Sequence, residues 1–272
     1  MPDVLAWRKK FGVLAPSTNT IVEPDLHMME VPGVTSHMGR IMMQNTVRHS
    51  ANVPDNDQRA IRLGNEMQPT IERLLTMEPD YLVMAMSAPT FRGGLEGNLR
   101  WKAQMQEYSG GLGMANGAEA CQRALNLLNV KRISVLTPYW SDTSDHVIQY
   151  FTESGFEVVA NIDLESPSAV GIGHITSDKC QEALLKINSD KAEAIIQCGT
   201  NLNMIRLADE ADRWLGKPVL AINATIWWMA LRDNGITDQL QGFGRMLRDY
   251  KPRGSQLDSE FSPEEVAGWL RP

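Results

Sequence analysis

The stretch A-E-A-I-I-Q-C-G-T-N-L-N, residues 192–203, indicates the fold of this chain. Its apolar run, Ala194-Ile195-Ile196, is typical of a strand buried on both faces of a parallel sheet. Cys198-Gly199-Thr200-Asn201 follows at once and supplies a thiol, a flexible step, a hydroxyl and an amide. Ligands of open α/β sheets bind beyond the carboxyl ends of the strands, so Cys198 is predicted to face a site. The alternative is a small, buried, structural cysteine.

Composition narrows the class of protein. The chain has 272 residues, of which 43% are hydrophobic and 22% charged, as in soluble globular proteins. A formal net charge of −7 argues against a nucleic-acid partner, because phosphate binding needs a concentrated basic surface. Small anionic substrates stay compatible with this charge, since a few local donors are enough to hold them.

Cysteine usage and the termini bear on location. The three cysteines are widely spaced and form neither a disulfide framework nor a metal-ligand pattern, so we expect no metal and a reducing cytoplasm. The first ten residues lack a signal-peptide core, and no segment approaches the length of a membrane span. We therefore expect a cytoplasmic protein with no membrane partner.

Strand and helix patterns alternate along the chain and occur twice. The predicted strands are 10–16, 34–43, 81–86 and 113–116, and then 131–138, 156–162, 192–198 and 219–224. The predicted helices are 57–77, 118–128, 144–154 and 177–187, with Pro69 expected to kink or divide the first of them. A further helix is predicted to start at Ser262, which is followed by Pro263 and by Glu265 three residues after it.

The second half of the chain repeats the order of the first. V-L-A-P at 13–16 becomes V-L-T-P at 135–138, and 192–198 answers 81–87. This order predicts an α/β fold of two pseudo-symmetric doubly wound lobes, each with a mostly parallel four-stranded sheet flanked by helices. Residues 1–117 plus 225–272 would form the first lobe, with the C-terminal segment packed back on it, and 118–224 the second. The active site would lie in the cleft between them, with Ser87 and Cys198 at equivalent positions on opposite walls.

Common cofactor motifs are missing from the sequence. It contains no P-loop, H-E-x-x-H or C-x-x-C, and the glycines of 111–117 have the wrong spacing for a dinucleotide fingerprint. We therefore expect no cofactor.

Neutral donors gather in the predicted strand-end loops, and several stand near helix N-termini. They are Ser17, Thr18, Asn19, Ser87, Thr90, Tyr139, Thr200 and Asn201. Such groups hold carboxylates or developing oxyanions without a metal. A thiol in these surroundings can have its pKa lowered toward neutrality and act as acid, base or nucleophile. Together they suit protonation at a carbon next to a carboxylate. Ordinary turn and cap chemistry is the alternative for each loop alone.

The segment P-S-T-N-T-I-V-E-P at 16–24 resembles the P-S-[ST]-N-T segment of maleate isomerases. With the two-lobe order, the chain resembles the Asp/Glu racemase superfamily, in its maleate cis–trans isomerase and arylmalonate decarboxylase branch. The resemblance implies that Asn19 binds a substrate carboxylate, that Tyr139 donates to it from the other lobe, and that Cys198 is the catalytic cysteine. It also makes a homo-oligomer plausible.

The chain departs from the isomerase pattern at two places. Racemases and maleate isomerases carry a cysteine in each lobe, whereas M-A-M-S-A-P-T at 84–90 has none, and Pro167 stands where isomerases tend to carry asparagine. A serine hydroxyl is a far weaker acid than a thiol, so Ser87 does not readily replace the missing cysteine. A single second-lobe cysteine is the arrangement of arylmalonate decarboxylase.

The sequence thus predicts a cofactor-independent isomerase or lyase that acts on a small carboxylate or dicarboxylate through an enolate-like intermediate. Cys198 and Ser87 are the expected catalytic residues, and the other donors are expected to bind substrate. Three functions remain open: a maleate isomerase-like enzyme, an arylmalonate-type decarboxylase with Cys198 as its sole proton donor, and a non-catalytic carboxylate-binding protein.

Overall fold

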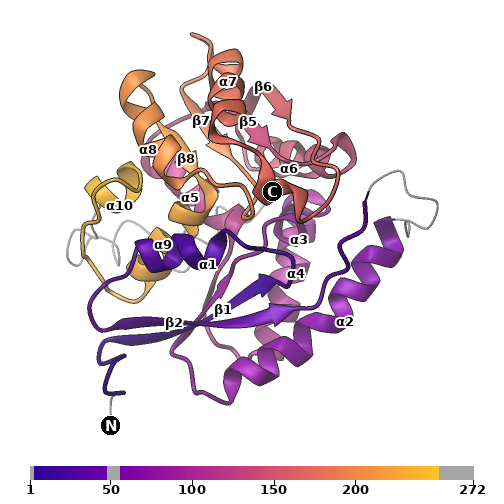
Figure 1. Ribbon diagram of the computed structural model, residues 1–272, viewed down its shortest axis with the longest axis vertical. Helices are drawn as coiled ribbons and strands as arrows, with labels where there is room; N and C mark the ends of the chain where they lie inside the picture. Colours follow the sequence, from indigo (N-terminus) through magenta and orange to yellow (C-terminus); the bar gives the residue numbers. More distant parts are fainter. Residues whose placement is uncertain (1–2, 48–55, 251–272) are drawn as a thin grey trace.

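The computed structural model describes residues 3–47 and 56–250. They form two four-stranded sheets, one in each lobe (Figure 1). The first sheet comprises β1 (Lys9–Pro16), β2 (Val34–Ile41), β3 (Tyr81–Met84) and β4 (Met114–Ala115). The second comprises β5 (Arg132–Thr137), β6 (Glu157–Asp163), β7 (Ala194–Gln197) and β8 (Val219–Ala221). Every strand pairing in them is parallel, which confirms the predicted fold class.

The two sheets have the same topology. Their strand orders are β2-β1-β3-β4 and β6-β5-β7-β8, so the four strands of each half of the chain are arranged in the same order in their sheet. The repeat read from the sequence is therefore present in the structure. Parallel strands put their carboxyl ends at one edge, which brings the loops after β1, β3, β5 and β7 toward the junction of the lobes.

The register of the strands corrects one expected equivalence. Leu14 pairs with Met84 in the first lobe, and Leu136 pairs with Gln197 in the second. The next amide then donates to the leucine carbonyl in both lobes, from Ala85 at 2.8 Å and from Cys198 at 2.9 Å. Cys198 is therefore equivalent to Ala85. The expected equivalence of Ser87 and Cys198 is wrong by two residues.

Helices connect the strands and cover the sheets. They are α1 (Val22–Met28), α2 (Asn56–Leu75), α3 (Ala88–Phe91), α4 (Gly94–Tyr108), α5 (Gly117–Leu127), α6 (Ser141–Glu153), α7 (Ser177–Ile187), α8 (Ile205–Trp214), α9 (Ile222–Asp233) and α10 (Arg245–Asp249), with a 3₁₀ turn, η1, at Gly171–His174. Among the described residues, no helix has the length and apolar character that crossing a membrane requires.

Helix α2 continues through Pro69 as one helix, so its predicted division in two is wrong. Met67, Ile71 and Leu74 lie on both sides of the proline and are buried against the first sheet. This apolar contact holds the helix together across the residue where a backbone donor is missing.

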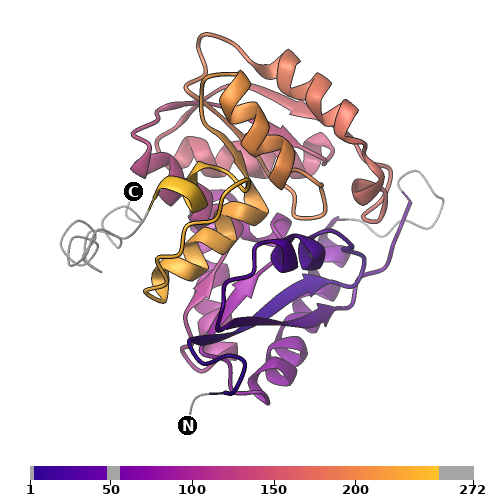
Figure 2. The ribbon, with the colours of Figure 1, turned by 60° about the vertical axis from the view of Figure 1, so that its left-hand side comes forward.

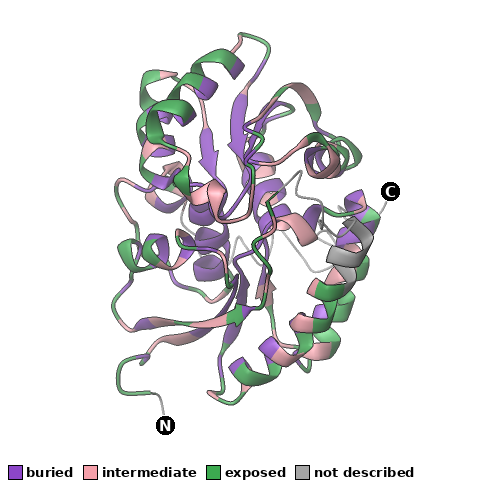
Figure 3. Cartoon of the chain, turned by 45° about the vertical axis from the view of Figure 1, so that its right-hand side comes forward, coloured by how far each residue is buried: buried purple, intermediate pink, exposed green. Residues whose placement is uncertain are grey.

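The two lobes share a hydrophobic core. One cluster of buried residues runs from Phe11 and Val13 in β1 to Ile195 and Ile196 in β7, while a smaller cluster lies between the first sheet and α2. The inner strands β1, β3, β5 and β7 are largely buried, the edge strands β2 and β6 are partly exposed, and the outer faces of the helices are exposed (Figure 3). The positions of the strand-end loops are therefore set by packing that both lobes contribute.

Helix α9 lies at the junction of the lobes (Figure 2). It contacts α1, β3 and β4 of the first lobe, α8 and β8 of the second, and α5, the helix that connects the two sheets. The indole Nε1 of Trp227 donates to the carbonyl of Met29 at 2.9 Å, and its ring meets Phe11 edge-on at 5.5 Å. These contacts tie the chain that leaves the second sheet to the first lobe.

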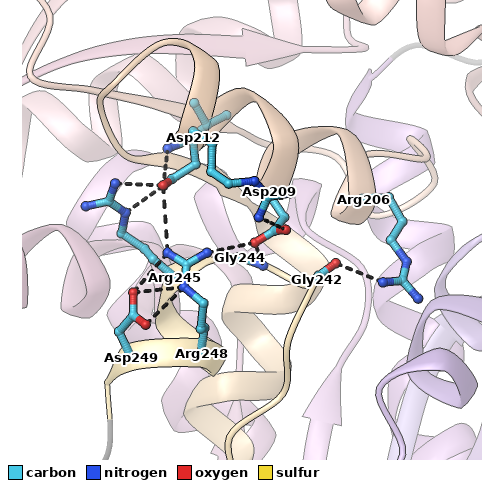
Figure 4. A network of polar contacts seen from close by, with 10 residues as sticks. Arg206, Asp209, Asp212, Gly242, Gly244, Arg245, Arg248 and Asp249 are labelled. Carbon is cyan, nitrogen blue, oxygen red and sulfur yellow. Dashed lines mark hydrogen bonds and ion pairs between the residues drawn. The ribbon is translucent and has the colours of Figure 1, made fainter.

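The segment after α9 is also held by ion pairs on α8 (Figure 4). Arg245 on α10 contacts both carboxylate oxygens of Asp212, at 2.5 and 2.7 Å. Arg248 reaches Asp209 at 3.0 Å. The contacts of α10 thus include second-lobe helix α8 as well as α9, while the division at residues 117 and 225 stays a prediction. The helix predicted to start at Ser262 lies outside the described residues.

Candidate active site

Cys198 follows β7 directly, and Gly199 shapes the turn that comes next. Gly199 has φ +134°, and a Cβ there would lie 2.5 Å from the ring of Pro138. Only glycine fits both this backbone conformation and this contact. Because Pro138 ends the neighbouring strand β5, the glycine lets the two strand-end loops of the second lobe pack together beside the thiol.

The thiol of Cys198 is fully buried. Burial, and then the neighbouring Cys121 thiol on α5, raise the pKa of Cys198 well above its usual value of 9.0. The expectation of a pKa lowered toward neutrality is therefore wrong, because the apolar surroundings disfavour the thiolate more than nearby dipoles favour it. The group is a neutral S–H at physiological pH, which makes it a proton donor rather than a ready nucleophile.

Tyr139 joins the two lobes beside this thiol. Its hydroxyl lies 2.6 Å from the Ser87 hydroxyl, across the junction. Burial raises the pKa of Tyr139, and the Cys198 thiol adds to this shift while the Ser87 contact opposes it. Tyr139 therefore stays a neutral donor. The structure brings Ser87, Tyr139 and Cys198 together as predicted.

A second link across the junction involves Asn19 and Thr200. The Asn19 side-chain oxygen accepts from the amides of Ile21 and Val22, at 2.9 and 3.0 Å, at the start of α1. This fixes which way the amide points, and its nitrogen donates to the Thr200 hydroxyl at 3.2 Å. A carboxylate that entered here would meet an NH₂ group with a preset orientation.

Asn201 connects its own loop, after β7, to two other loops. Its oxygen accepts from the Thr20 amide at 2.9 Å, and its nitrogen donates to the Ala169 carbonyl at 2.8 Å. Both ends of the amide are therefore engaged within the protein. Asn201 contributes to the site through the position of its loop.

Three predicted binding residues make hydrogen bonds within the protein: Ser17 and Thr90 to the backbone, and Thr18 to a methionine side chain. Ser17 exchanges hydrogen bonds with the backbone of Met43, and the Thr18 hydroxyl points to the sulfur of Met43. Thr90 is buried, donates to the Ser87 carbonyl at 2.7 Å and accepts from the Ala118 amide at 3.3 Å. Loop sequences rich in hydroxyls do not distinguish such turn contacts from ligand contacts.

Three other residues near these loops, Asp25, Arg40 and Asn223, were not singled out from the sequence, and a fourth residue, Cys121, lies beside Cys198. Arg40 donates to the Asn19 carbonyl at 2.8 Å and to the Pro16 carbonyl at 3.3 Å, so it braces the Asn19 loop from β2. Cys121 is buried within α5, and its approach to Cys198 depends on how the lobes pack. An arginine on a strand and an acid on a short helix look like ordinary surface residues in sequence.

A cavity of about 1110 Å³ opens beside these residues. Tyr139 forms part of its wall, as do Met86 and Ala88 on either side of Ser87. The cavity gives a small molecule access to the Tyr139 side of the site. Cys198 is fully buried and is not among the residues that line the cavity, so contact between its thiol and a ligand requires neighbouring groups to move.

Within the described residues, no three histidine, cysteine or acidic side chains gather as a metal site. The fold and the site define a class of two-lobed α/β proteins in which neutral donors and one strand-end thiol meet between equivalent sheets.

The comparison with known families agrees with this class. The model of the arylmalonate decarboxylase family matches residues 81–247, well over half of the chain. The chain therefore belongs to the arylmalonate decarboxylase family. The match includes β3, β5 and β7 and hence Ser87, Tyr139 and Cys198, while the Asn19 loop lies before it.

Relatives and solved structures extend the likeness to nearly the whole chain. Maleate isomerase from Geobacillus stearothermophilus is 24% identical over 251 residues, which cover 88% of this chain and 96% of that protein. A cysteine-to-serine variant of the Nocardia farcinica maleate cis–trans isomerase, with a covalently bound succinylcysteine intermediate, has a TM-score of 0.79 at 21% identity and covers 89% of this chain and 99% of its own. Arylmalonate decarboxylase has a TM-score of 0.69 at 16% identity, with 88% and 98% covered.

Proposed function

We propose that this protein is a cofactor-independent enzyme that protonates a carbon next to a carboxylate, with Cys198 as the proton donor. The observation that carries the proposal is the neutral, fully buried Cys198 thiol beside Tyr139, whose hydroxyl meets Ser87 from the other lobe. Such a site supplies a proton and, within the same space, donors for the negative charge that precedes its transfer.

The substrate class that fits best is a substituted malonate. Its carbon–carbon bond to one carboxylate would break and release CO₂, leaving the electron pair in an enediolate. The hydroxyls of Ser87, Tyr139 and Thr200 and the amide of Asn19 would stabilise this charge. Cys198 would then transfer its proton to the carbon, and the resulting thiolate would recover a proton from water.

The opposite wall of the site favours decarboxylation over isomerisation. By strand register, the position equivalent to Cys198 is Ala85, and Ser87 corresponds to Thr200. A methyl group neither removes a proton nor adds to a double bond. Reversible proton transfer on both faces of the substrate carbon would need two thiols that face each other. These two strand ends supply only one thiol, that of Cys198.

Isomerisation of a maleate-like dicarboxylate is the second candidate. It is favoured by the P-S-T-N-T segment at 16–20 and by the likeness to maleate isomerases over 88% of the chain. A cysteine adduct that allows rotation about the double bond would have to form on Cys198, whose raised pKa opposes it.

Turnover of two substrates separates these candidates. We would offer methyl-phenylmalonate and maleate to the purified protein and follow CO₂ and fumarate, with Cys198→Ala as the control. The proposal predicts CO₂ from the malonate, lost in Cys198→Ala, and no fumarate. Fumarate from maleate would overturn it in favour of isomerisation. Malonate binding with neither product would leave the third function, a carboxylate-binding protein.

An engineered variant tests the argument from Ala85. Ala85→Cys would place a thiol at the position equivalent to Cys198, directly after β3. We expect this variant to form fumarate from maleate, or to racemise an α-aryl carboxylate, where the parent protein does neither.

We also propose a cytoplasmic location, where its three free thiols would stay reduced, and a homo-oligomeric assembly.

A further inference from the structure

A buried carboxylate lies next to the site and takes no part in the chemistry above. Asp25 on α1 is 1% exposed, and its Oδ2 accepts a hydrogen bond of 2.7 Å from the Asn223 side chain, in the first turn of α9. Burying a carboxylate costs free energy unless partners compensate for the lost water. A residue kept at that cost calls for a role that an apolar side chain does not fill.

Asn223 connects this carboxylate to the loop that follows Cys198. Its nitrogen also donates to the backbone carbonyl of Thr200, at 2.9 Å. The amide has two N–H groups, so both are used, one toward the first lobe and one toward the second-lobe loop. Its oxygen is buried and has no hydrogen-bond partner among the described residues. The position of Asn223 thus depends on what its nitrogen contacts.

These bonds close a ring that passes through the carboxylate-binding groups. Thr200, held by its carbonyl, accepts from Asn19 through its hydroxyl at 3.2 Å. Asn19 in turn caps α1, the helix that carries Asp25. Asp25 therefore helps to orient the Asn19 amide and the Thr200 hydroxyl through Asn223, although its side chain contacts neither of them.

We propose that Asp25 is a positioning residue that, through Asn223, holds Thr200 and Asn19 in the geometry needed to bind the substrate's carboxylate. This inference rests on the proposed function, since it assigns those two side chains to the carboxylate. Asp25 acts as a hydrogen-bond acceptor for the Asn223 nitrogen, a role that an amide oxygen at the same place can also fill and an alanine cannot. The Asn223 nitrogen therefore lies between two acceptors, the Asp25 carboxylate and the Thr200 carbonyl.

The test measures carboxylate binding as well as turnover. Malonate is titrated by calorimetry into the full-length protein and into the variants Asp25→Ala, Asn223→Ala and Asp25→Asn. We expect each alanine variant to weaken malonate binding and raise KM by about 10- to 100-fold, the effect of losing one positioned hydrogen bond to a charged group. We expect kcat to change little, because the proton donor is untouched. Asp25→Asn, which keeps an acceptor, is expected to retain most of the binding.

Tyr81→Phe is the matched control. It removes a buried hydrogen bond of 2.7 Å between β3 and α9, to Asp233, away from the strand ends that form the site. If Asp25 had only a structural role, Asp25→Ala would lower the amount of active protein and hence the apparent kcat, while KM stayed unchanged. Tyr81→Phe would then show the same effect. An unchanged malonate affinity in Asp25→Ala, or an equal loss in Tyr81→Phe, would overturn the inference.

The two proposals fail in different ways. If the parent protein binds malonate without turnover and Asp25→Ala weakens that binding, the reaction is wrong and the positioning role stands. If turnover occurs but Asp25→Ala matches the parent in KM and affinity, the reaction stands and the positioning role is wrong. A parent protein that neither binds malonate nor turns it over would overturn both.

Discussion

Cys198 combines a position suited to chemistry with an environment that keeps its proton in place. It begins the loop after β7, yet it is fully buried and lies next to the Cys121 thiol. An acid that is to protonate carbon must be protonated when the carbanion forms, and burial ensures this. The same burial makes the residue a poor nucleophile at neutral pH.

The activity should therefore persist at alkaline pH. Because the pKa of Cys198 is raised above 9.0, the S–H form predominates throughout pH 7 to 9, and kcat/KM for the malonate should be flat over that range. The check is a pH–rate profile under saturating and limiting substrate. A loss of activity with rising pH, at an apparent pKa below 8, would contradict this account. It would show that the proton donor is not a thiol with a raised pKa.

Gly199 is the residue on which the loop depends most directly. In Gly199→Ala the Cβ would lie 2.5 Å from Pro138 at φ +134°, so we expect a loss of about 1–3 kcal/mol in stability together with loss of turnover. Thermal unfolding and the malonate assay measure the two effects. Gly216→Ala, at φ +66° with no atom within 4 Å, is the control and should lose only about 1 kcal/mol and keep its activity.

At the scale of elements, α9 and α10 decide how the end of the described chain is held. Helix α9 is buried on nearly all sides, which agrees with its apolar sequence I-N-A-T-I-W-W-M-A-L. Helix α10 is short, packs against α9 and carries two arginines that reach α8 (Figure 4). A five-residue helix is not stable by itself, so these contacts and its burial at Met246 and Leu247 keep it in place.

The ion pair between Arg245 and Asp212 should contribute measurably to stability. Asp212 is 4% exposed and receives two hydrogen bonds from the guanidinium, so Asp212→Ala would leave an arginine without its acceptor. We expect a loss of about 2–3 kcal/mol, measured by thermal unfolding. Asp249, which pairs with Arg248 but is half exposed, is the control, and Asp249→Ala should change stability by less than about 1 kcal/mol. Equal losses in both variants would contradict this account.

At the scale of the whole molecule, two lobes with equal topology pack around a shared core, and the site lies where their strand ends meet. Direct hydrogen bonds from Asn19, Thr20 and Ser87 to second-lobe groups close this junction. Substrate entry must exchange some of these bonds for bonds to the carboxylate. The balance between closed and open lobes should therefore affect KM as much as any single contact does.

The pH dependence of stability should contain a contribution from Asp25. Burial raises the pKa of Asp25 from 3.8 to about 6, and the Asn223 hydrogen bond opposes this shift. Between these values the folded state binds more protons than the unfolded state, so this contribution is fully present below about pH 4 and is lost as pH rises through about 6. The shift corresponds to about 3 kcal/mol.

Replacing the carboxyl group by an amide should remove that loss. Asp25→Asn is therefore expected to unfold at a higher temperature than the parent protein at pH 8 and at a similar temperature at pH 4. The measurement is a thermal unfolding series of both proteins in matched buffers. A variant less stable than the parent at pH 8 would mean that the charge of Asp25 is stabilised by the fold.

Much of the fold follows from local patterns. The strand runs at 10–16, 131–138 and 192–198 and the repeated V-L-x-P segments predicted two equivalent parallel sheets, because strands buried on both faces are apolar throughout and end in turn-forming residues. Of the two outcomes predicted at Pro69, a kink or a division, the division of α2 is wrong, since the proline's local effect was outweighed by apolar contacts on either side.

The sequence by itself predicted which residues would carry the chemistry: a thiol at one strand end and neutral donors at the others, namely Cys198, Ser87, Tyr139, Asn19 and Thr200. Only the tertiary structure decided how they act. The pKa of Cys198 depends on burial and on Cys121, its equivalence to Ala85 depends on strand register, and the hold on Thr200 depends on Asp25, almost two hundred positions away from Asn223. These are relations in space between distant segments, and local sequence patterns do not encode them.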